Sequence, residues 1–99
     1  MAFVKLYVDD IRPTPEQFTH RAYSVNEAIA LIEKLERNGD IIELISLDHD
    51  AGAYYSDGGD FINILDYLVE HEKFYPVMFH TANPVGRENM TRIVNRFWP

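Results

Sequence analysis

The sequence predicts one α/β domain in which helices cover a parallel β-sheet. Short apolar runs alternate with amphipathic stretches in the order strand, strand, helix, strand, helix, strand, helix. Such alternation favours parallel strands joined by helical crossovers. The length of 99 residues suits a single core. With no repeat, linker or low-complexity segment, residues 1–99 are expected to form one domain.

Four segments are predicted to be strands. Phe3–Val8 is an apolar run that acidic residues and prolines bring to an end. Ile41–Leu47 is apolar and β-branched, which is typical of a central buried strand. Val77–Phe79 is a short apolar run after a proline. Phe18–Tyr23 alternates poorly, so it is predicted to be a strand that could lie at the sheet edge.

Three helices are predicted from capping signals and apolar spacing. Ser24 and Glu27 form a capping-box pattern that starts the first helix, and Asn38-Gly39 is a typical stop. The second helix begins at Asp60 after a loop of residues 51–60, and the third follows Asn83-Pro84. Their apolar stripes are Phe61, Ile64, Leu65 and Leu68 in the second and Met90, Ile93, Val94 and Phe97 in the third. Phe97 and Trp98 are expected to make the last core contacts, although an exposed interface is the alternative.

Composition restricts the possible partners and the compartment. The net charge of −7 and the absence of a basic footprint argue against general affinity for nucleic acid or anionic membranes. From Pro84 onward three arginines face one acid, so this tail is +2 and the remainder is −9. This asymmetry suggests a cation site in the body and a phosphate held from the tail, or simply a solvated helix face. Without cysteine, a leader or an apolar span, the protein is expected to be cytoplasmic.

Polar residues follow three of the predicted strands. Asp9-Asp10, Asp48-His49-Asp50 and His80-Thr81-Ala82-Asn83 come directly after apolar runs. Because the carboxyl ends of parallel strands share one edge of the sheet, we expect these groups to converge there. Clustered carboxylates repel, and a hard cation such as Mg²⁺ or Mn²⁺ relieves that repulsion. Asp9, Asp10 and Asp48 are therefore predicted metal ligands, although each alone could be a turn residue or helix cap.

Other residues near this edge are candidates for acid–base work and phosphate binding. His49 or His80 could act as a general acid, or His49 and His80 together with an aspartate could form a zinc site. Arg12 and Arg87 could hold a phosphate, and Arg12 could instead neutralise the acid pair. Gly58-Gly59 could form a phosphate-binding helix start or a plain loop tip. His20 and His71 are expected to be surface residues.

The motifs LYVDD, LISLD and DGGD, with Thr81-Ala82 after a later strand, resemble the receiver domains of two-component signalling. The resemblance implies that Asp9 and Asp10 hold Mg²⁺, that Asp48 is the phosphoacceptor and that Thr81 is the switch hydroxyl. The chain departs from receivers in two respects. Two prolines occupy the place of the first helix and no lysine follows Lys73, so we expect neither that helix nor the fifth strand with its lysine.

The altered motifs VDD-x-RP, SLDHD and FHTANPVGREN are similar to a narrower family, the cyclic-phosphate-processing receiver-like domains. This resemblance implies a receiver-like (flavodoxin-like) three-layer sandwich with a short, mainly parallel four-stranded sheet that lacks the first helix and the fifth strand. It also implies metal-dependent action on, or binding of, cyclic phosphate groups of nucleotides or RNA ends.

The resulting hypothesis is metal-dependent hydrolysis of a cyclic phosphodiester. Asp9, Asp10 and Asp48 would hold Mg²⁺ or Mn²⁺, and His49 or His80 would protonate the leaving oxygen. Asp50 would orient an imidazole, and the substrate would be held by Arg12, Thr81, Asn83 and Arg87. A covalent variant through Asp48 is also open. The alternatives are a phosphate or cyclic-nucleotide binding module without turnover, and a degenerate receiver that is phosphorylated on Asp48.

Overall fold

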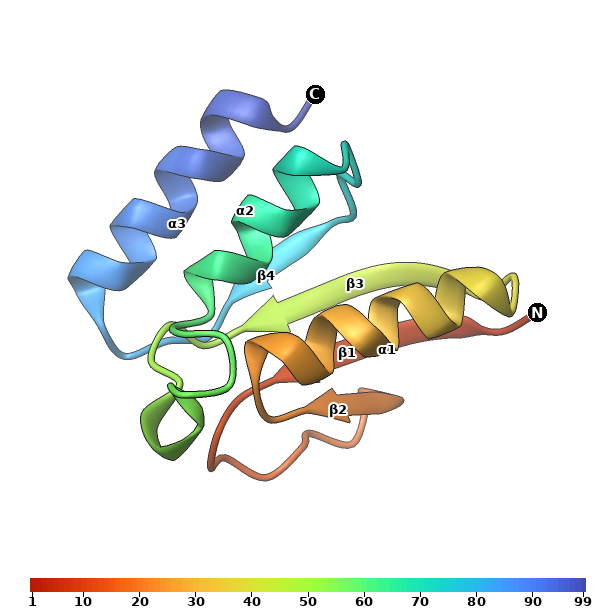
Figure 1. Ribbon diagram of the computed structural model, residues 1–99, viewed down its shortest axis with the longest axis horizontal. Helices are drawn as coiled ribbons and strands as arrows, with labels where there is room; N and C mark the ends of the chain where they lie inside the picture. The colour runs from red at the N-terminus through yellow and green to blue at the C-terminus, as the bar shows by residue number, and fades with distance from the viewer.

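A parallel four-stranded sheet in the order β2-β1-β3-β4 is the frame of the structure, a computed structural model that describes residues 1–99 (Figure 1). The strands are β1 (Phe3–Val8), β2 (His20–Ala22), β3 (Ile41–Leu47) and β4 (Val77–Phe79). The helices are α1 (Val25–Arg37), α2 (Ile62–Glu70) and α3 (Pro84–Phe97), with a short 3₁₀ turn at Gly52–Tyr54. The predicted order of elements is confirmed.

Two boundaries differ from the prediction for local reasons. Strand β2 has three residues rather than six, because the Phe18 N–H bonds back to the Pro15 carbonyl and the Phe18 ring packs on Tyr7. Helix α2 starts at Ile62 rather than Asp60, because the Asp60 carboxylate accepts the Ala51 N–H and holds a turn instead. Strand β2 does lie at the sheet edge.

All three helices cover the same face of the sheet. The crossovers from β2 to β3 and from β3 to β4 run in the same direction, so their right-handedness places α1 and α2 on one side. Helix α3 packs beside α2. The receiver-like fold is thus confirmed in a truncated form with two layers, where three were expected. The reason is that residues 9–19 form a loop rather than a helix, so no helix crosses to the other face.

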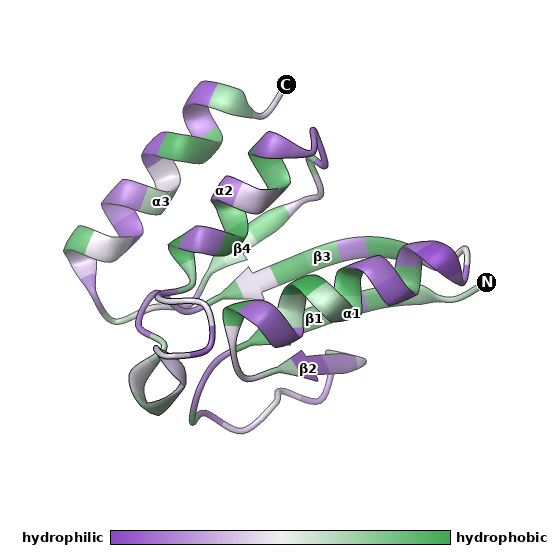
Figure 2. Cartoon of the chain, in the orientation of Figure 1, coloured by the Kyte–Doolittle hydropathy of each residue, from purple (hydrophilic) through white to green (hydrophobic).

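One apolar cluster between the sheet and the helices makes the core. Figure 2 shows the apolar strands β1 and β3 beneath α1, whose residues alternate between hydrophobic and hydrophilic. The predicted stripe of α2 is fully buried, and so is Met90 of α3. Phe97 is 42% exposed, which corrects the expectation that it is a core residue, since it lies at the end of α3, the last helix, which packs beside α2. Trp98 packs against the core, as expected, and its Nε1 donates to the Tyr75 carbonyl at 2.8 Å.

The Ser24 cap also anchors the loop that precedes α2. Its hydroxyl accepts the Glu27 N–H at 3.1 Å and donates to Asp57 at 2.5 Å. Gly58, at φ +114°, lies so close to α1 that an added Cβ would be 2.7 Å from Val25 Cβ. The Gly58-Gly59 pair therefore packs this loop on α1 instead of forming a free loop tip. None of the helices is both long and apolar enough to cross a bilayer.

A charged cluster ties the end of α1 to the segment before β4. Glu36 accepts a hydrogen bond from Lys73 Nζ at 2.6 Å and another from the Tyr75 hydroxyl. Burial acts to raise the pKa of Glu36, but these two donors outweigh it and the pKa is lowered from 4.5. Burial and the neighbouring Glu36 raise the pKa of Tyr75 to about 12. The cluster thus stabilises the fold while Glu36 is ionised.

We expect Glu36→Gln to lower the free energy of unfolding at pH 7 by about 1–2 kcal/mol, because it removes a charge-assisted pair that is partly exposed. Since the folded pKa lies below 4.5, this contribution is complete above pH 4.5 and is lost as the pH falls through the folded value. Urea unfolding from pH 7 to pH 3 measures the difference. Glu33→Gln, at an exposed position on the same helix, is the control and should change little. A Glu36→Gln deficit that persisted at pH 3 would contradict this account.

Candidate cyclic-phosphate site

The strand register places the polar residues in two successive rows at one edge of the sheet. Val8 pairs with Leu47, and Leu47 pairs with Phe79, so β1, β3 and β4 end level with one another. The ladder continues for one more residue: Asp48 N–H donates to the Val8 carbonyl and His80 N–H to the Leu47 carbonyl. Asp9, Asp48 and His80 therefore form the first row, with their side chains on the sheet face that no helix covers.

Asp9 is a fully buried carboxylate that is held on several sides. Its Oδ1 accepts the N–H groups of Ile11 and Arg12, both at 2.9 Å, and its Oδ2 is 2.9 Å from His80 Nε2. Burial acts to raise the pKa of Asp9, but the backbone donors and His80 outweigh it, so the pKa lies below its usual range. Asp9 is therefore ionised at neutral pH.

Asp10 and Asp48 complete a group of three carboxylates. One oxygen from each of Asp9, Asp10 and Asp48 lies within 4.8 Å of the others. Burial raises the pKa of Asp10, and the charges of Asp9 and Asp48 raise it further. A Cβ on Gly52, at φ +56°, would lie 2.2 Å from Asp10 Oδ2, so a side chain there would displace this carboxylate. Three convergent oxygens under mutual repulsion are a donor set that fits a hard divalent cation.

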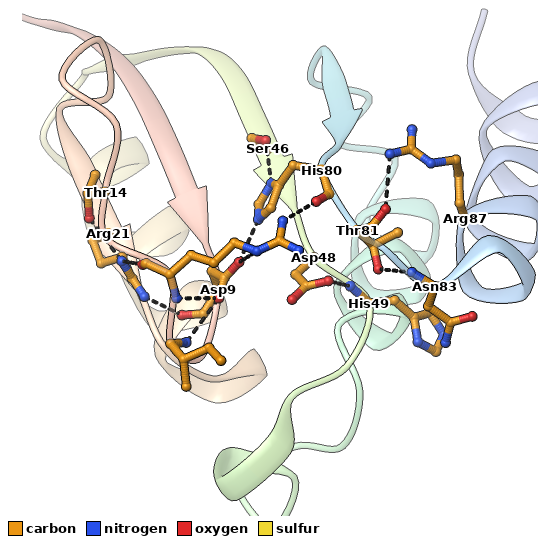
Figure 3. Close-up of polar contacts among 12 residues, drawn as sticks. Asp9, Thr14, Arg21, Ser46, Asp48, His49, His80, Thr81, Asn83 and Arg87 are labelled. Carbon is orange, nitrogen blue, oxygen red and sulfur yellow. Dashed lines mark hydrogen bonds and ion pairs between the residues drawn. The ribbon is translucent and has the colours of Figure 1, made fainter.

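His80 is bound through both ring nitrogens. Nδ1 lies 2.7 Å from Ser46 Oγ and Nε2 lies 2.9 Å from Asp9 Oδ2 (Figure 3), and the ring stacks on Tyr7 with centroids 4.3 Å apart. Burial lowers the pKa of His80, although Asp9 opposes the change. A neutral ring that donates from Nε2 to Asp9 and accepts the Ser46 hydroxyl at Nδ1 satisfies both partners. His80 therefore orients a carboxylate of the group.

His49 comes one residue after Asp48, in the row that follows the first, and it belongs to a second group of polar side chains. Its Nδ1 is 2.7 Å from Asp50 Oδ1, and one ligand atom each of His49, Asp50 and Asp60 lie within 4.8 Å of one another. The hydrogen bond from His49 lowers the pKa of Asp50, with Asn83 adding to the effect. A Cβ on Gly86 would be 2.4 Å from the His49 ring, so this glycine allows α3 to approach the imidazole. Nε2 of His49 has no hydrogen-bond partner in the chain.

The remaining predicted residues join the strand ends to α3 and to the β1–β2 loop. Asn83 caps α3, because its Oδ1 accepts the Gly86 N–H at 3.0 Å while its Nδ2 is 3.3 Å from Asp50. Thr81 is 6% exposed, and its carbonyl accepts from Arg87 at 3.2 Å. Arg12 crosses the sheet edge to the His80 carbonyl, with its Nε 3.9 Å from Asp9 Oδ2. Arg12 thus neutralises the buried acid, one of its two predicted roles.

The structure therefore separates what the sequence predicted to be one convergent set. Asp9, Asp10, Asp48 and His80 lie together, whereas His49, Asp50 and Asn83 form a neighbouring group that is joined to the first through the Asp48-His49 peptide. A zinc site that combines both histidines does not fit, because His80 already bonds through both nitrogens. Lys73, the last lysine of the chain, is paired with Glu36 and does not serve the site.

Three supporting residues were missed by the sequence analysis. Ser46 interrupts the apolar strand β3, and that interruption was the available signal. Arg21 donates to the carbonyls of Asp9 and Arg12 and to the Thr14 hydroxyl, so it holds the loop that follows β1. Tyr7 looked like an ordinary strand residue, and only the packing shows that it stacks on His80.

Comparison with known protein families matches residues 4–96 to the family described as the cyclic-phosphate processing receiver domain. The chain belongs to this family. The match covers almost the whole domain and includes every residue of both groups described above. The comparisons with curated proteins and with solved structures found no significant match. The family thus relates this domain to cyclic-phosphate processing. The reaction itself has to be argued from the arrangement of the carboxylates and histidines.

We expect Asp10→Asn to raise the Tm of the protein in EDTA, because burial and two neighbouring carboxylates raise the pKa of Asp10 and disfavour its charged form. Mn²⁺ should raise the Tm of the wild type and have a smaller effect on the variant. Asp66→Asn, at an exposed position of α2, is the control for loss of one charge. Equal Mn²⁺ shifts for the wild type and Asp10→Asn would contradict the role of Asp10 as a ligand.

Proposed function

We propose that this domain hydrolyses cyclic phosphodiesters of nucleotides or RNA ends with the help of a divalent cation held by Asp9, Asp10 and Asp48. The observation that carries the proposal is the three-carboxylate group, whose oxygens lie within 4.8 Å of one another at the end of the sheet. The family supports the substrate class, since it is described by cyclic-phosphate processing. Mg²⁺ and Mn²⁺ are the cations that suit an all-carboxylate set.

The cation supplies positive charge that polarises the phosphate and lowers the pKa of water. The chain's own residues prepare that position. His80, braced by Ser46 and Tyr7, keeps Asp9 Oδ2 in one orientation, while two backbone N–H groups fix Oδ1. Holding a ligand through a hydrogen-bonded histidine reduces the reorganisation needed on binding.

Hydrolysis forms a bond between a water oxygen and phosphorus and breaks the bond from phosphorus to one ribose oxygen. The leaving oxygen needs a proton, and the proton that the water loses restores the donor. We assign the donor to His49, because its Nε2 is unbonded whereas both nitrogens of His80 are engaged. Asp50 fixes the orientation of the His49 ring, and Asn83 holds Asp50.

Groups beside the carboxylates can hold the remaining phosphate oxygens. The Thr81 hydroxyl oxygen accepts the Asn83 N–H at 3.1 Å, which leaves its own proton free to donate. Arg87 lies next to Thr81, and the Arg12 side chain is 42% exposed beside Asp9. Thr81 and Arg87 at the start of α3 and Arg12 beside Asp9 thus offer hydrogen-bond donors, which suit an anionic ester. Asn83 acts by positioning, since both ends of its amide are engaged.

We expect turnover of 2′,3′- or 3′,5′-cyclic nucleotides, or of RNA ending in a cyclic phosphate, with Mg²⁺ or Mn²⁺ but not in EDTA. Asp48→Asn should abolish it. His49→Gln should lower kcat by about 10²–10⁴, the usual contribution of a general acid, and leave the Kd for the substrate nearly unchanged. His71→Gln, on the surface beyond α2, is the control. If nothing on this panel is hydrolysed while ligands still raise the Tm, the domain is a binding module and hydrolysis is wrong.

The two histidines should behave differently. We expect His80→Ala to weaken Mn²⁺ affinity by about 10–100-fold. The variant loses the hydrogen bond that holds the Asp9 carboxylate in the orientation for binding the cation. Saturating Mn²⁺ should then restore most of the His80→Ala activity but none of that of His49→Gln. Ser46→Ala should shift Mn²⁺ affinity in the same direction by a smaller factor. If Mn²⁺ restored the activity of His49→Gln, the assignment of His49 as the general acid would be wrong.

A further inference from the structure

The largest hollow on the surface lies beside the carboxylates rather than over them. It has a volume of about 520 Å³ and extends from Thr81 along the outer side of α3. Its lining comes from Thr81, Ala82, Pro84, Arg87, Glu88, Thr91, Arg92 and Asn95. We call this surface the α3 groove. It begins at residues that border the proposed phosphate site and leads away from them.

The lining residues of α3 form a line along the helix. Positions 84, 87, 88, 91, 92 and 95 follow the i, i+3 and i, i+4 spacing of neighbours on a helix surface, so they share one face. From position 84 to position 95 the helix rises about 17 Å. A stacked nucleic-acid strand rises about 3.4 Å per nucleotide, so the groove is long enough for several nucleotides. A mononucleotide would fill only the Thr81 end.

The chemistry of the α3 groove suits a sugar–phosphate backbone. Arg87 is anchored at the Thr81 carbonyl, and Arg92 is 69% exposed with one guanidinium nitrogen 3.0 Å from Glu88. Thr91 and Asn95 add a hydroxyl and an amide, which can pair with 2′-hydroxyl groups. No aromatic side chain lines the groove, so base stacking is not offered there.

The distribution of charge along the chain also favours an anionic ligand at α3. From Pro84 onward the chain carries +2, while the preceding residues carry −9. The α3 groove itself holds Arg87 and Arg92 against Glu88, a net charge of +1, so it attracts an anionic polymer that the acidic remainder of the chain repels. Binding confined to this face is compatible with the net charge of −7.

We propose that the α3 groove binds the backbone of a single-stranded RNA whose terminal 2′,3′-cyclic phosphate occupies the carboxylate site. The preferred substrate is then an oligoribonucleotide rather than a free cyclic nucleotide. The upstream phosphates run from Thr81 past Arg87 to Arg92. This inference rests on the proposed function for the position of the terminal phosphate, but the groove itself can be tested by binding alone.

The test compares a pentaribonucleotide that ends in a 2′,3′-cyclic phosphate with the nucleoside 2′,3′-cyclic phosphate of the same terminal base. Fluorescence anisotropy gives the Kd of the labelled pentanucleotide, and initial rates give kcat/KM for both compounds. We expect Arg92→Gln to weaken pentanucleotide binding about two- to fivefold and to reduce its logarithmic salt dependence by about 0.7. Glu88→Gln should strengthen binding, since it removes the acid that competes for Arg92.

Arg96→Gln is the matched control, because Arg96 is on the same helix but does not line the α3 groove. It should leave both compounds unaffected. Three results would each contradict RNA binding in the α3 groove. The first is an equal loss of pentanucleotide affinity in Arg92→Gln and Arg96→Gln. The others are a pentanucleotide that binds no better than the mononucleotide, and displacement by poly-glutamate that is as effective as displacement by RNA. Arg92-dependent binding without any turnover would retain the groove and reject hydrolysis. Turnover of the mononucleotide without any advantage for the pentanucleotide would support hydrolysis and reject the α3 groove as an RNA-binding site.

Discussion

The rest of the site depends on one buried charge, the carboxylate of Asp9. A fully buried anion is costly unless donors surround it, and here two backbone N–H groups and a histidine supply them. Those donors come from the loop after β1 and from the end of β4, on either side of β3. Satisfying this charge therefore fixes the β1–β2 loop and the start of the β4–α3 connection at the same time. The same bonds keep Asp9 ionised beside two further acids.

The truncated fold allows this arrangement. Because residues 9–19 form a loop, Arg12 can cross the sheet edge to the His80 carbonyl and Arg21 can hold the loop from β2. All helices lie on one face, so Tyr7, Ser46 and His80 pack together on the other without a helix above them. The sheet face without a covering helix supports the buried carboxylate of Asp9. The functional groups thus rely on side-chain packing where a complete sandwich would use a helix.

Charges act in opposite senses at two places in this domain. At the strand ends three acids lie together, and burial, with the charges of Asp9 and Asp48 adding to it, raises the pKa of Asp10. The Glu36 cluster lies elsewhere, between α1 and the segment before β4, and there the charges attract. The core and this distant pair therefore stabilise the fold, while the three acids at the strand ends repel one another.

Sequence alone determined the order of elements, the parallel sheet and the acids at its edge, because apolar periodicity and turn residues are local properties. It also carried the family resemblance. What it left open was which side chains meet: alternation along each strand separates His80 from His49, and register decides the neighbours of each. Ser46 and Tyr7 joined the site only through packing. The α3 groove is lined only by residues 81–95, and it is open because the tertiary structure leaves this face of α3 uncovered, which no spacing in the sequence specifies.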